Sequence, residues 1–420
     1  MNDIGIPPEW LRGRRIVNHF RGSRSVTTKS GLCSSMKNLP WIAAQDPDEF
    51  FPRSYDLTNK ADKAAFADDF HNTAAVSVLK RFQAAGGDAT TPAPKRHRFR
   101  RPMIVAALRV ATHLLVCAEG SHPTVDNADG DLSISDDQWH DLLKYSYLLH
   151  NAGIGTPSAM DAALWDTAVP ARDVVFPGSD DAMVARVCRV LTRLQAHRPQ
   201  WHMDGVCNVW VVKPGCASRG VGIGLFSTLD DVLNRTDNGR VVQKYVEPAM
   251  LMRDLGSTMP AVKFDIRQFV LVTSWAPLTI HVYDTFYMRL ATRTFSMTSS
   301  GITDKLAHVC NYAVQRGAAG APEAAPDAED TWTATNLLHC LRELHGVEGG
   351  ATVFRDKIQA RMREAIIGVF RAAQPHVAHR AGSFELYGVD FVLDDRCTPW
   401  LLEVNLSPAL NKRTPYLRRM

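Results

Sequence analysis

The amino-acid sequence predicts an α/β fold of the α+β type, with a mainly helical N-terminal extension followed by a largely antiparallel sheet. Apolar residues recur at helical spacing before residue 200. Between residues 206 and 291, runs of β-branched and aromatic residues are joined by short turns. Residues 383–408 hold another pair of alternating runs around a turn. Strands linked by short turns pair antiparallel, because a parallel pair needs a long crossover.

Helices dominate the first 200 residues of the predicted fold. Residues 61–82 predict a helix because their apolar side chains approximate one face. Residues 86–101 are rich in glycine, proline, threonine and positive charge, which is typical of a surface linker, and an apolar helix resumes at residue 102. Residues 136–198 carry two further apolar stripes at helical spacing.

Strands dominate the next hundred residues. The expected strands are residues 206–214, 240–247, 261–275 and 278–291, with one helix at 228–235. Residues 317–330 are rich in alanine, proline and glycine, which predicts a mobile loop. Helices follow at 331–345 and 352–373, and the second has apolar residues every four positions, as expected of a helix packed on the core.

The C-terminal hairpin places two carboxylates face to face. With a turn centred between Arg396 and Cys397, Asp390 lies opposite Glu403, and Asn405 shares the face of Glu403. Like charges in direct cross-strand register repel, so the arrangement favours a cation between them. Two carboxylates and an amide are oxygen ligands that suit Mg²⁺. The alternative is an exposed acidic strand edge.

Positive charge and glycine gather on the earlier strands. Lys213 precedes the glycine-rich run KPGCASRGVGIG, which also contains Arg219 and could cover a phosphate or form a plain hairpin turn. In KFDIR, residues 263, 265 and 267 share one strand face, and Arg289 lies in a similar row. Arginines in such rows could grip phosphate or carboxylate groups; the alternative is a solvent-exposed face with cross-strand ion pairs.

Composition sets limits on function. The chain has 420 residues, 45% hydrophobic and 22% charged, which suits two or three globular domains and excludes wholesale disorder. The net charge of +4 argues against a nucleic-acid partner. The eight cysteines form no metal or CxxC pattern, which indicates a reducing compartment. The N-terminus lacks a secretory signal, and the apolar run 103–118 is interrupted by Arg109 and His113, so no membrane span is predicted.

Together these features are the parts of an ATP-dependent ligase. A resemblance to the tubulin–tyrosine-ligase-like family covers residues 135–410 and rests on WVVKPGCASRGVGIG, VVQKYVE, KFDIRQFVLVTSW, FYMRLAT, HVCNYAVQ, SFELYGVDF and WLLEVNLSP. Residues 16–41 and 46–57 resemble the extension of the glycylase branch, the tubulin monoglycylases. The resemblance implies an ATP-grasp-type fold for the catalytic core.

The expected domain organisation combines this resemblance with the composition shifts. The divisions are an N-terminal extension of glycylase type (1–85), a basic linker (86–101), a helical region leading into the core (102–200), an ATP-grasp catalytic core (201–410) and a basic tail (411–420).

The resemblance also implies site residues. For ATP they are the phosphate contacts Lys213, Arg219 and Gly220, the adenine hinge Gln243, Lys244, Tyr245 and Val246, and the completing pair Lys263 and Asp265. The catalytic residues would be Arg267 and Arg289, near the γ-phosphate and the incoming amino acid, and Asn311. Mg²⁺ would be held by Asp390, Glu403 and Asn405. Two positions depart from the family pattern: Cys310 replaces the usual threonine, and Leu406 the usual alanine.

The function implied is an ATP-dependent acid–amino-acid ligase that adds glycine to glutamate side chains of tubulin tails through an isopeptide bond. The γ-phosphoryl group would activate the glutamate as an acyl phosphate, which the amine of free glycine attacks. Because no side-chain nucleophile is needed, His308 and the cysteines are interpreted as structural. The resemblance implies a monomer in the cytoplasm, on the cytoskeleton of a cilium or flagellum. The basic residues 95–101 could attract acidic microtubule tails.

Other functions stay open at this stage. A glutamylase or tyrosine ligase of the same family would use the same ATP chemistry with another amino-acid pocket. A non-catalytic microtubule-binding protein would lose a metal ligand or phosphate lysine, yet all these positions are filled. A small-molecule ATP-grasp ligase would need neither the N-terminal extension nor the basic segments.

Overall fold

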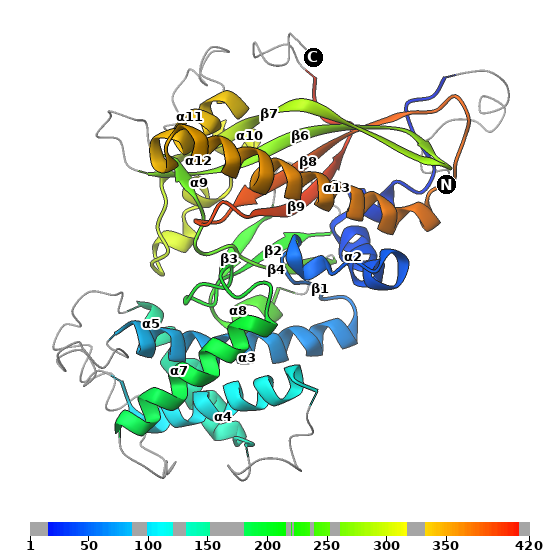
Figure 1. Cartoon of the computed structure of the whole chain (residues 1–420). Coiled ribbons are helices and arrows are strands. Elements are labelled where there is room, and N and C mark those ends of the chain that lie inside the picture. Colours follow the sequence, from blue (N-terminus) through cyan, green and yellow to red (C-terminus); the bar gives the residue numbers. More distant parts are fainter. Residues whose placement is uncertain are drawn as a thin grey trace.

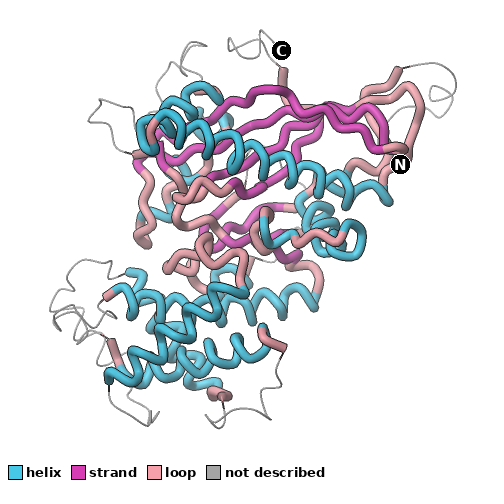
Figure 2. Tube along the Cα trace, viewed as in Figure 1, coloured by secondary structure: helices cyan, strands magenta, loops and turns pink. Residues whose placement is uncertain are grey.

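The fold has three parts stacked along its long axis, seen in Figure 1 and, by type of secondary structure, in Figure 2. The computed structural model describes residues 16–85, 99–120, 132–151, 180–215, 220, 222–235, 239–252, 261–316 and 332–410. A helical bundle lies at one end, a small sheet in the middle, and a large sheet with its covering helices at the other end. The predicted α+β class, with helices first and antiparallel sheets after, is confirmed.

Four long helices build the bundle: α3 (Lys60–Ala84), α4 (Arg101–Ala118), α5 (Asp136–Asn151) and α7 (Asp180–His197). The helix predicted at 61–82 is α3, and the Asn59 side chain caps it by accepting from the N–H groups of Ala61 and Asp62. Helix α4 is apolar and long enough to cross a membrane by length and composition alone. Ten of its residues are buried, and it packs against α3, α5 and α7, as expected of a core helix.

The small sheet has the order β1-β4-β2-β3, with every neighbouring pair antiparallel. Its strands are β1 (Ser54–Asp56), β2 (Trp210–Pro214), β3 (Gly224–Phe226) and β4 (Arg240–Lys244), and helix α8 (Leu229–Leu233) connects β3 to β4. Strand β2 starts four residues later than predicted. The reason is Glu247, whose carboxylate accepts the N–H groups of residues 206, 207 and 209 and so holds that segment as a loop.

The large sheet is also antiparallel. Its strands are β5 (Leu251–Met252), β6 (Val262–Trp275), β7 (Leu278–Thr294), β8 (Glu385–Leu393) and β9 (Pro399–Leu406). Strand β6 is central, because it pairs with β7 along one edge and with β5 and β8 along the other, and β9 pairs with β8. The predicted strands at 261–275 and 278–291 and the C-terminal hairpin are confirmed.

Helices from both ends of the chain cover the large sheet. They are α1 (Arg24–Thr27), α2 (Lys29–Ala43), α11 (Ala334–His345), α12 (Val347–Thr352) and α13 (Ala360–Ala373). Residues 353–359 form a π-helix between α12 and α13. A four-residue apolar spacing would drift about 40° per step around a straight α-helix, and the wider π-turn reduces that drift. Ile358 near the end of the π-helix, and Met362 and Ile366 on α13, all lie in the core.

The N-terminal segment is part of both sheet layers. Phe20, Leu32 and Met36 are buried in the core under the large sheet, and β1 extends the small sheet. The remaining short elements are 3₁₀ turns at Pro47–Glu49, Gly301–Thr303 and Gln374–His376, and helices α9 (Lys305–His308) and α10 (Tyr312–Arg316). The loop predicted at 317–330 and the tail at 411–420 lie outside the described residues, as does most of the basic linker.

Candidate functional site

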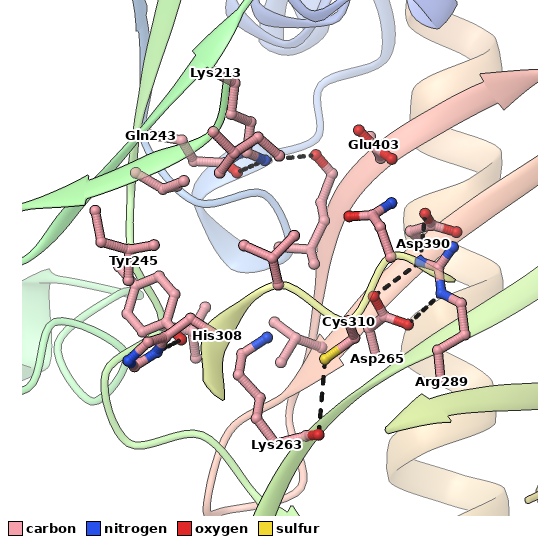
Figure 3. Close-up of a pocket in the computed structure, with 18 of the residues that line it drawn as sticks. Lys213, Gln243, Tyr245, Lys263, Asp265, Arg289, His308, Cys310, Asp390 and Glu403 are labelled. Carbon is pink, nitrogen blue, oxygen red and sulfur yellow. Dashed lines mark hydrogen bonds and ion pairs between the residues drawn. The ribbon is translucent and has the colours of Figure 1, made fainter. Parts of the chain in front are cut away.

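A cleft lies between the two sheets and collects most of the predicted site residues. Figure 3 shows side chains from both sheets converging on it. The predicted residues in its lining are Lys213, Gln243, Lys244, Tyr245, Val246, Lys263, Asp265, Arg289, Asn311, Asp390 and Glu403.

The other predicted residues lie beside this lining or outside the described chain. Arg267 and Asn405 both bond to Asp390. Gly220 has a φ of +76°, and an added Cβ would lie 2.5 Å from Val314 Cγ2, so a glycine fits this turn. Arg219 is not among the described residues.

The floor of the cleft is a row of polar side chains directly opposite one another on four strands. Arg267 on β6 faces Tyr287 on β7 and Asp390 on β8. Asp390 in turn faces Glu403 on β9, as the sequence predicts. A bulge on β9 just after Leu401 creates this last pair, because Phe391 faces Leu401 while Asp390 faces Glu403.

Two arginines neutralise the Asp390 carboxylate and so reduce its predicted repulsion with Glu403. Arg267 binds the carboxylate through Nε and, at 2.9 Å, through Nη2. Arg289 Nη2 donates to Asp390 Oδ2 at 2.8 Å, and the same guanidinium grips Asp265 with bonds of 2.6 and 2.8 Å. Burial alone would raise the pKa of Asp390, but the two arginines outweigh it and hold that pKa well below its ordinary value.

Both solvent-exposed alternatives are therefore wrong for this face. Asp390 is 1% exposed, which excludes an exposed acidic edge. Lys263, Asp265 and Arg267 are buried as well, with Lys263 and Asp265 lining the cleft and Arg267 beside it, so this face of the KFDIR segment is not exposed to solvent. Cross-strand ion pairs do form on this face, between Arg267 and Asp390 and between Arg289 and Asp265, but they are buried instead of exposed to solvent.

Asn405 brings both acidic side chains to one point. Its Nδ2 lies 3.1 Å from Asp390 Oδ2 and 3.2 Å from Glu403 Oε1. Within the described residues, no group of three or more His, Cys, Asp or Glu side chains could hold a metal by itself. The two carboxylates fit Mg²⁺ that is also bound by phosphates, since this ion keeps few protein ligands, and Asn405, whose Nδ2 faces them here, would bind the ion through Oδ1.

Lys213 marks a second charged position, on the small sheet. Its Nζ donates to Gln243 Oε1 at 2.6 Å and to the carbonyl of Leu402 at 3.4 Å. Gln243 is fixed in turn, because its Nε2 donates to Ser54 Oγ on β1 at 3.0 Å. Burial lowers the pKa of Lys213 to about 8, although Glu403 acts to raise it.

Tyr245, directly after β4, presents an aromatic ring to the cleft. Tyr245 Oη lies 2.8 Å from His308 Nδ1, and His308 Nε2 donates to the carbonyl of Gly301 at 3.1 Å. Burial lowers the pKa of His308 to about 4, so its imidazole is neutral. Its Nδ1 accepts a hydrogen bond from the Tyr245 hydroxyl, which fixes the tyrosine ring. The Lys244 amine points elsewhere, to Glu247 at 2.7 Å.

Lys263 and Cys310 sit at the opposite wall. The Lys263 side chain extends into the cleft, with Nζ 5.9 Å from the centre of the Tyr245 ring. Burial raises the pKa of the Cys310 thiol to about 12, which leaves it protonated and unsuited to act as a nucleophile. This agrees with the structural role expected of the cysteines.

Sequence reasoning missed the apolar walls of the cleft. The residues are Val211, Ile223, Leu225, Val309, Val392 and Leu402. Four of them lie in strands and look like ordinary strand residues, but Val211 stands two positions before Lys213 and Val392 two positions after Asp390. Side chains two apart share a strand face, so this spacing could have identified them. The cleft thus suits a ligand with a flat apolar part and an anionic part.

Comparison with known proteins supports a family assignment. The model of the tubulin-tyrosine ligase family matches residues 177–420. The chain is 32% identical to tubulin monoglycylase TTLL3 of Danio rerio over 440 aligned residues, covering 98% of this chain and 52% of the relative. It is 31% identical to protein monoglycylase TTLL8 of Mus musculus over 433 aligned residues, covering 96% and 48%. The chain spans about half the length of these relatives.

The floor of the cleft depends on a glycine. A Cβ added to Gly388 would lie 2.9 Å from Arg267 Cδ and 3.0 Å from its Nε. We expect Gly388→Ala to displace Arg267 from Asp390 and lower the free energy of unfolding by about 1–3 kcal/mol. Chemical denaturation and a crystal structure of the variant measure both effects.

The control is Gly349→Ala in α12, where the nearest atom to an added Cβ lies 3.3 Å away. Because alanine is favoured over glycine within a helix, it should leave the protein as stable as before or up to about 1 kcal/mol more stable. An unchanged Arg267–Asp390 pair in a Gly388→Ala protein of normal stability would contradict the steric argument.

Proposed function

The chain belongs to the tubulin-tyrosine ligase family, and we propose that it is an ATP-dependent ligase joining glycine to glutamate side chains of tubulin tails. The observation that carries the proposal is the cleft between the sheets, which unites an apolar slot, basic side chains and a convergent pair of carboxylates. The choice of glycine is supported by the names of the relatives, tubulin and protein monoglycylases, which match nearly the whole chain.

The polarity of the cleft suggests how ATP would lie. The adenine would stack between the apolar walls near Tyr245. The phosphates would extend toward Lys213, Lys263 and the carboxylate pair, because lysine ammonium groups bind phosphate. Asp390, Glu403 and Asn405 would hold Mg²⁺, which supplies positive charge to the phosphates when bound.

The two arginines would act by holding fixed positive charge. Asp265 and Asp390 grip the Arg289 guanidinium from two sides, so it is oriented before any substrate arrives. Guanidinium groups held in this way stabilise charge that develops during phosphoryl transfer without reorganising. Arg267 and Asn311 would complete the region where the glutamate and the amino acid meet.

The reaction proposed has two steps. A glutamate carboxylate oxygen attacks the γ-phosphorus and ADP leaves, which forms an acyl phosphate. The glycine amine then attacks the acyl carbon, inorganic phosphate leaves, and the amine gives up a proton as the isopeptide bond forms. The chain needs to align these groups and exclude water; neither step needs a side-chain nucleophile. This agrees with the buried, protonated Cys310.

Acidic tubulin tails are the proposed protein substrate. The basic residues at 95–101 would attract them electrostatically, although residues 95–98 lie outside the described part of the chain. The proposed setting is the cytoskeleton, in the axoneme of a cilium or flagellum, with free glycine as the second substrate and the chain acting as a monomer.

A transfer assay tests the function. The protein is incubated with microtubules, ATP, Mg²⁺ and glycine, glutamate or tyrosine in turn, and the tubulin tails are weighed by mass spectrometry. We expect mass increments for glycine alone. A glutamate increment would place the chain with the glutamylases, and the absence of any adduct together with absent ATP binding would indicate a non-catalytic microtubule-binding protein.

The Glu403→Gln variant tests the proposed metal site in the same assay. It removes one proposed metal-ligand charge while keeping the side-chain shape, so glycine transfer should fall at least about a hundredfold. Glu364→Gln, at an exposed position of α13, is the control and should retain full transfer. Full activity of Glu403→Gln would remove Glu403 from the proposed metal site.

Nucleotide affinity should depend on pH through Lys213. Phosphates favour the charged amine, and the pKa of Lys213 without nucleotide is about 8. Below pH 8 the amine already carries its proton, whereas above pH 8 binding must take one up, so affinity falls as pH rises, by up to about tenfold per unit. Calorimetric titration with an ATP analogue between pH 7 and 9.5 measures this slope.

The Lys213→Met variant should bind the ATP analogue more weakly at pH 7, and its affinity should no longer fall as the pH rises. Lys80→Met is the control, because burial also lowers the pKa of Lys80 to about 8, yet Lys80 does not line this cleft. If Lys80→Met lost the slope and Lys213→Met kept it, the assignment of Lys213 to the phosphates would be wrong.

A further inference from the structure

The N-terminal segment places a lysine at the carboxylate end of the cleft. Helix α2 begins at Lys29, after Thr28, whose side chain accepts the N–H of Gly31 at 3.1 Å. Lys29 Nζ lies 3.6 Å from Glu403 Oε2, an ion pair with side-chain exposures of only 15% and 20%. The chain brings these two residues together from opposite ends.

The same residue contacts the start of the glycine-rich segment. The backbone N–H of Lys29 donates to the carbonyl of Gly215 at 3.2 Å. A Cβ on Gly215 would lie 3.0 Å from Ser30 Oγ, and one on Gly31 would lie 2.3 Å from the carbonyl of Arg24. Glycine at both positions allows this close approach, so the turn at the start of α2 is packed directly on the segment after Lys213.

The position of Lys29 is set by the core. Val26, Leu32 and Met36, on the helices that flank and follow the turn, are each at most 2% exposed in the core beneath the large sheet. Helix α2 also packs against α13 and β9. A lysine carried by such a well-packed element keeps its backbone in place, so only the side chain can adjust to a ligand.

The charges around Lys29 are those of an anion site. Burial is the main cause of the lowered pKa of Lys213, and Glu403 acts to raise that pKa. Lys29 is close enough that its positive charge lowers the pKa further. Lys263 and Asp390 also act on Lys213, but Asp390 is already paired with two arginines, so the three lysines beside Glu403 leave positive charge that an anion can neutralise. Glu403 and Tyr245 lie at opposite ends of the cleft in Figure 3, so this charge gathers away from the proposed adenine slot.

We propose that Lys29 is a phosphate-binding residue of the nucleotide site, contributed by the N-terminal segment from outside the matched family domain. The inference rests on the proposed ATP-dependent function and extends it. Lys29 would contact the terminal phosphate of the nucleotide, with its ion pair to Glu403 holding the ammonium in position. The N-terminal segment is then a functional part of the active site as well as a structural part of the core.

Comparing triphosphate with diphosphate binding tests the proposal. Dissociation constants for a non-hydrolysable ATP analogue and for ADP, both with Mg²⁺, are measured by calorimetry on the full chain. Lys29→Gln should weaken binding of the analogue about tenfold or more, since a charge-assisted phosphate contact is lost. Binding of ADP should change less than about threefold. Lys29→Arg keeps the charge and should recover most of the preference for the triphosphate.

Lys37→Gln is the matched control, because it removes another lysine of α2 that pairs with a carboxylate, Asp62, away from the cleft. It should bind both nucleotides normally. If Lys29→Gln affected neither nucleotide, or both equally, Lys29 would be a structural clamp on Glu403 and the inference would be wrong while the proposed function stood. If the unsubstituted chain bound no nucleotide, both would fail.

Discussion

The Asp390 carboxylate, held between Arg267 and Arg289, is the interaction on which the site depends. Asp390 is 1% exposed and joins side chains from three neighbouring strands of the large sheet, because Asn405 also donates to it. Removing one partner of a buried pair costs about 3–5 kcal/mol, since the other charge stays behind without compensation. The side chains at the floor of the cleft therefore stabilise one another as a set, and losing any one of them would leave the others without compensation.

Much of this floor follows from local pattern. Side chains alternate along a strand and the C-terminal turn is short, so the opposition of Asp390 and Glu403 could be predicted without any other part of the chain. The predicted turn centre is half a residue later than the one that the pairing of Phe391 with Leu401 gives. The extra residue of the bulge after Leu401 shifts the register, so that Asp390 still faces Glu403. This bulge could not be predicted, because a bulge has no clear signature in an apolar strand.

The rest of the site arises from contacts between distant residues, which local pattern does not reveal. Whether Arg267 meets phosphate or Asp390 depends on which strand lies beside β6, and that strand is more than a hundred residues away. The same holds for Ser54 with Gln243 and for Lys29 with Glu403. The N-terminal segment resembles a family extension by sequence, but its position beside Glu403 can be seen only when both sheets are assembled.

The central claim is that Asp390, Glu403 and Asn405 form one metal-binding site at the proposed phosphate end of the cleft. The most direct test is a crystal structure of the chain with Mn²⁺ and a non-hydrolysable ATP analogue, using anomalous scattering to locate the metal. The account predicts a manganese peak between the carboxylates of Asp390 and Glu403, with phosphate oxygens completing its ligands. Ordered nucleotide with the manganese bound elsewhere, and Asp390 held only by its two arginines, would contradict it.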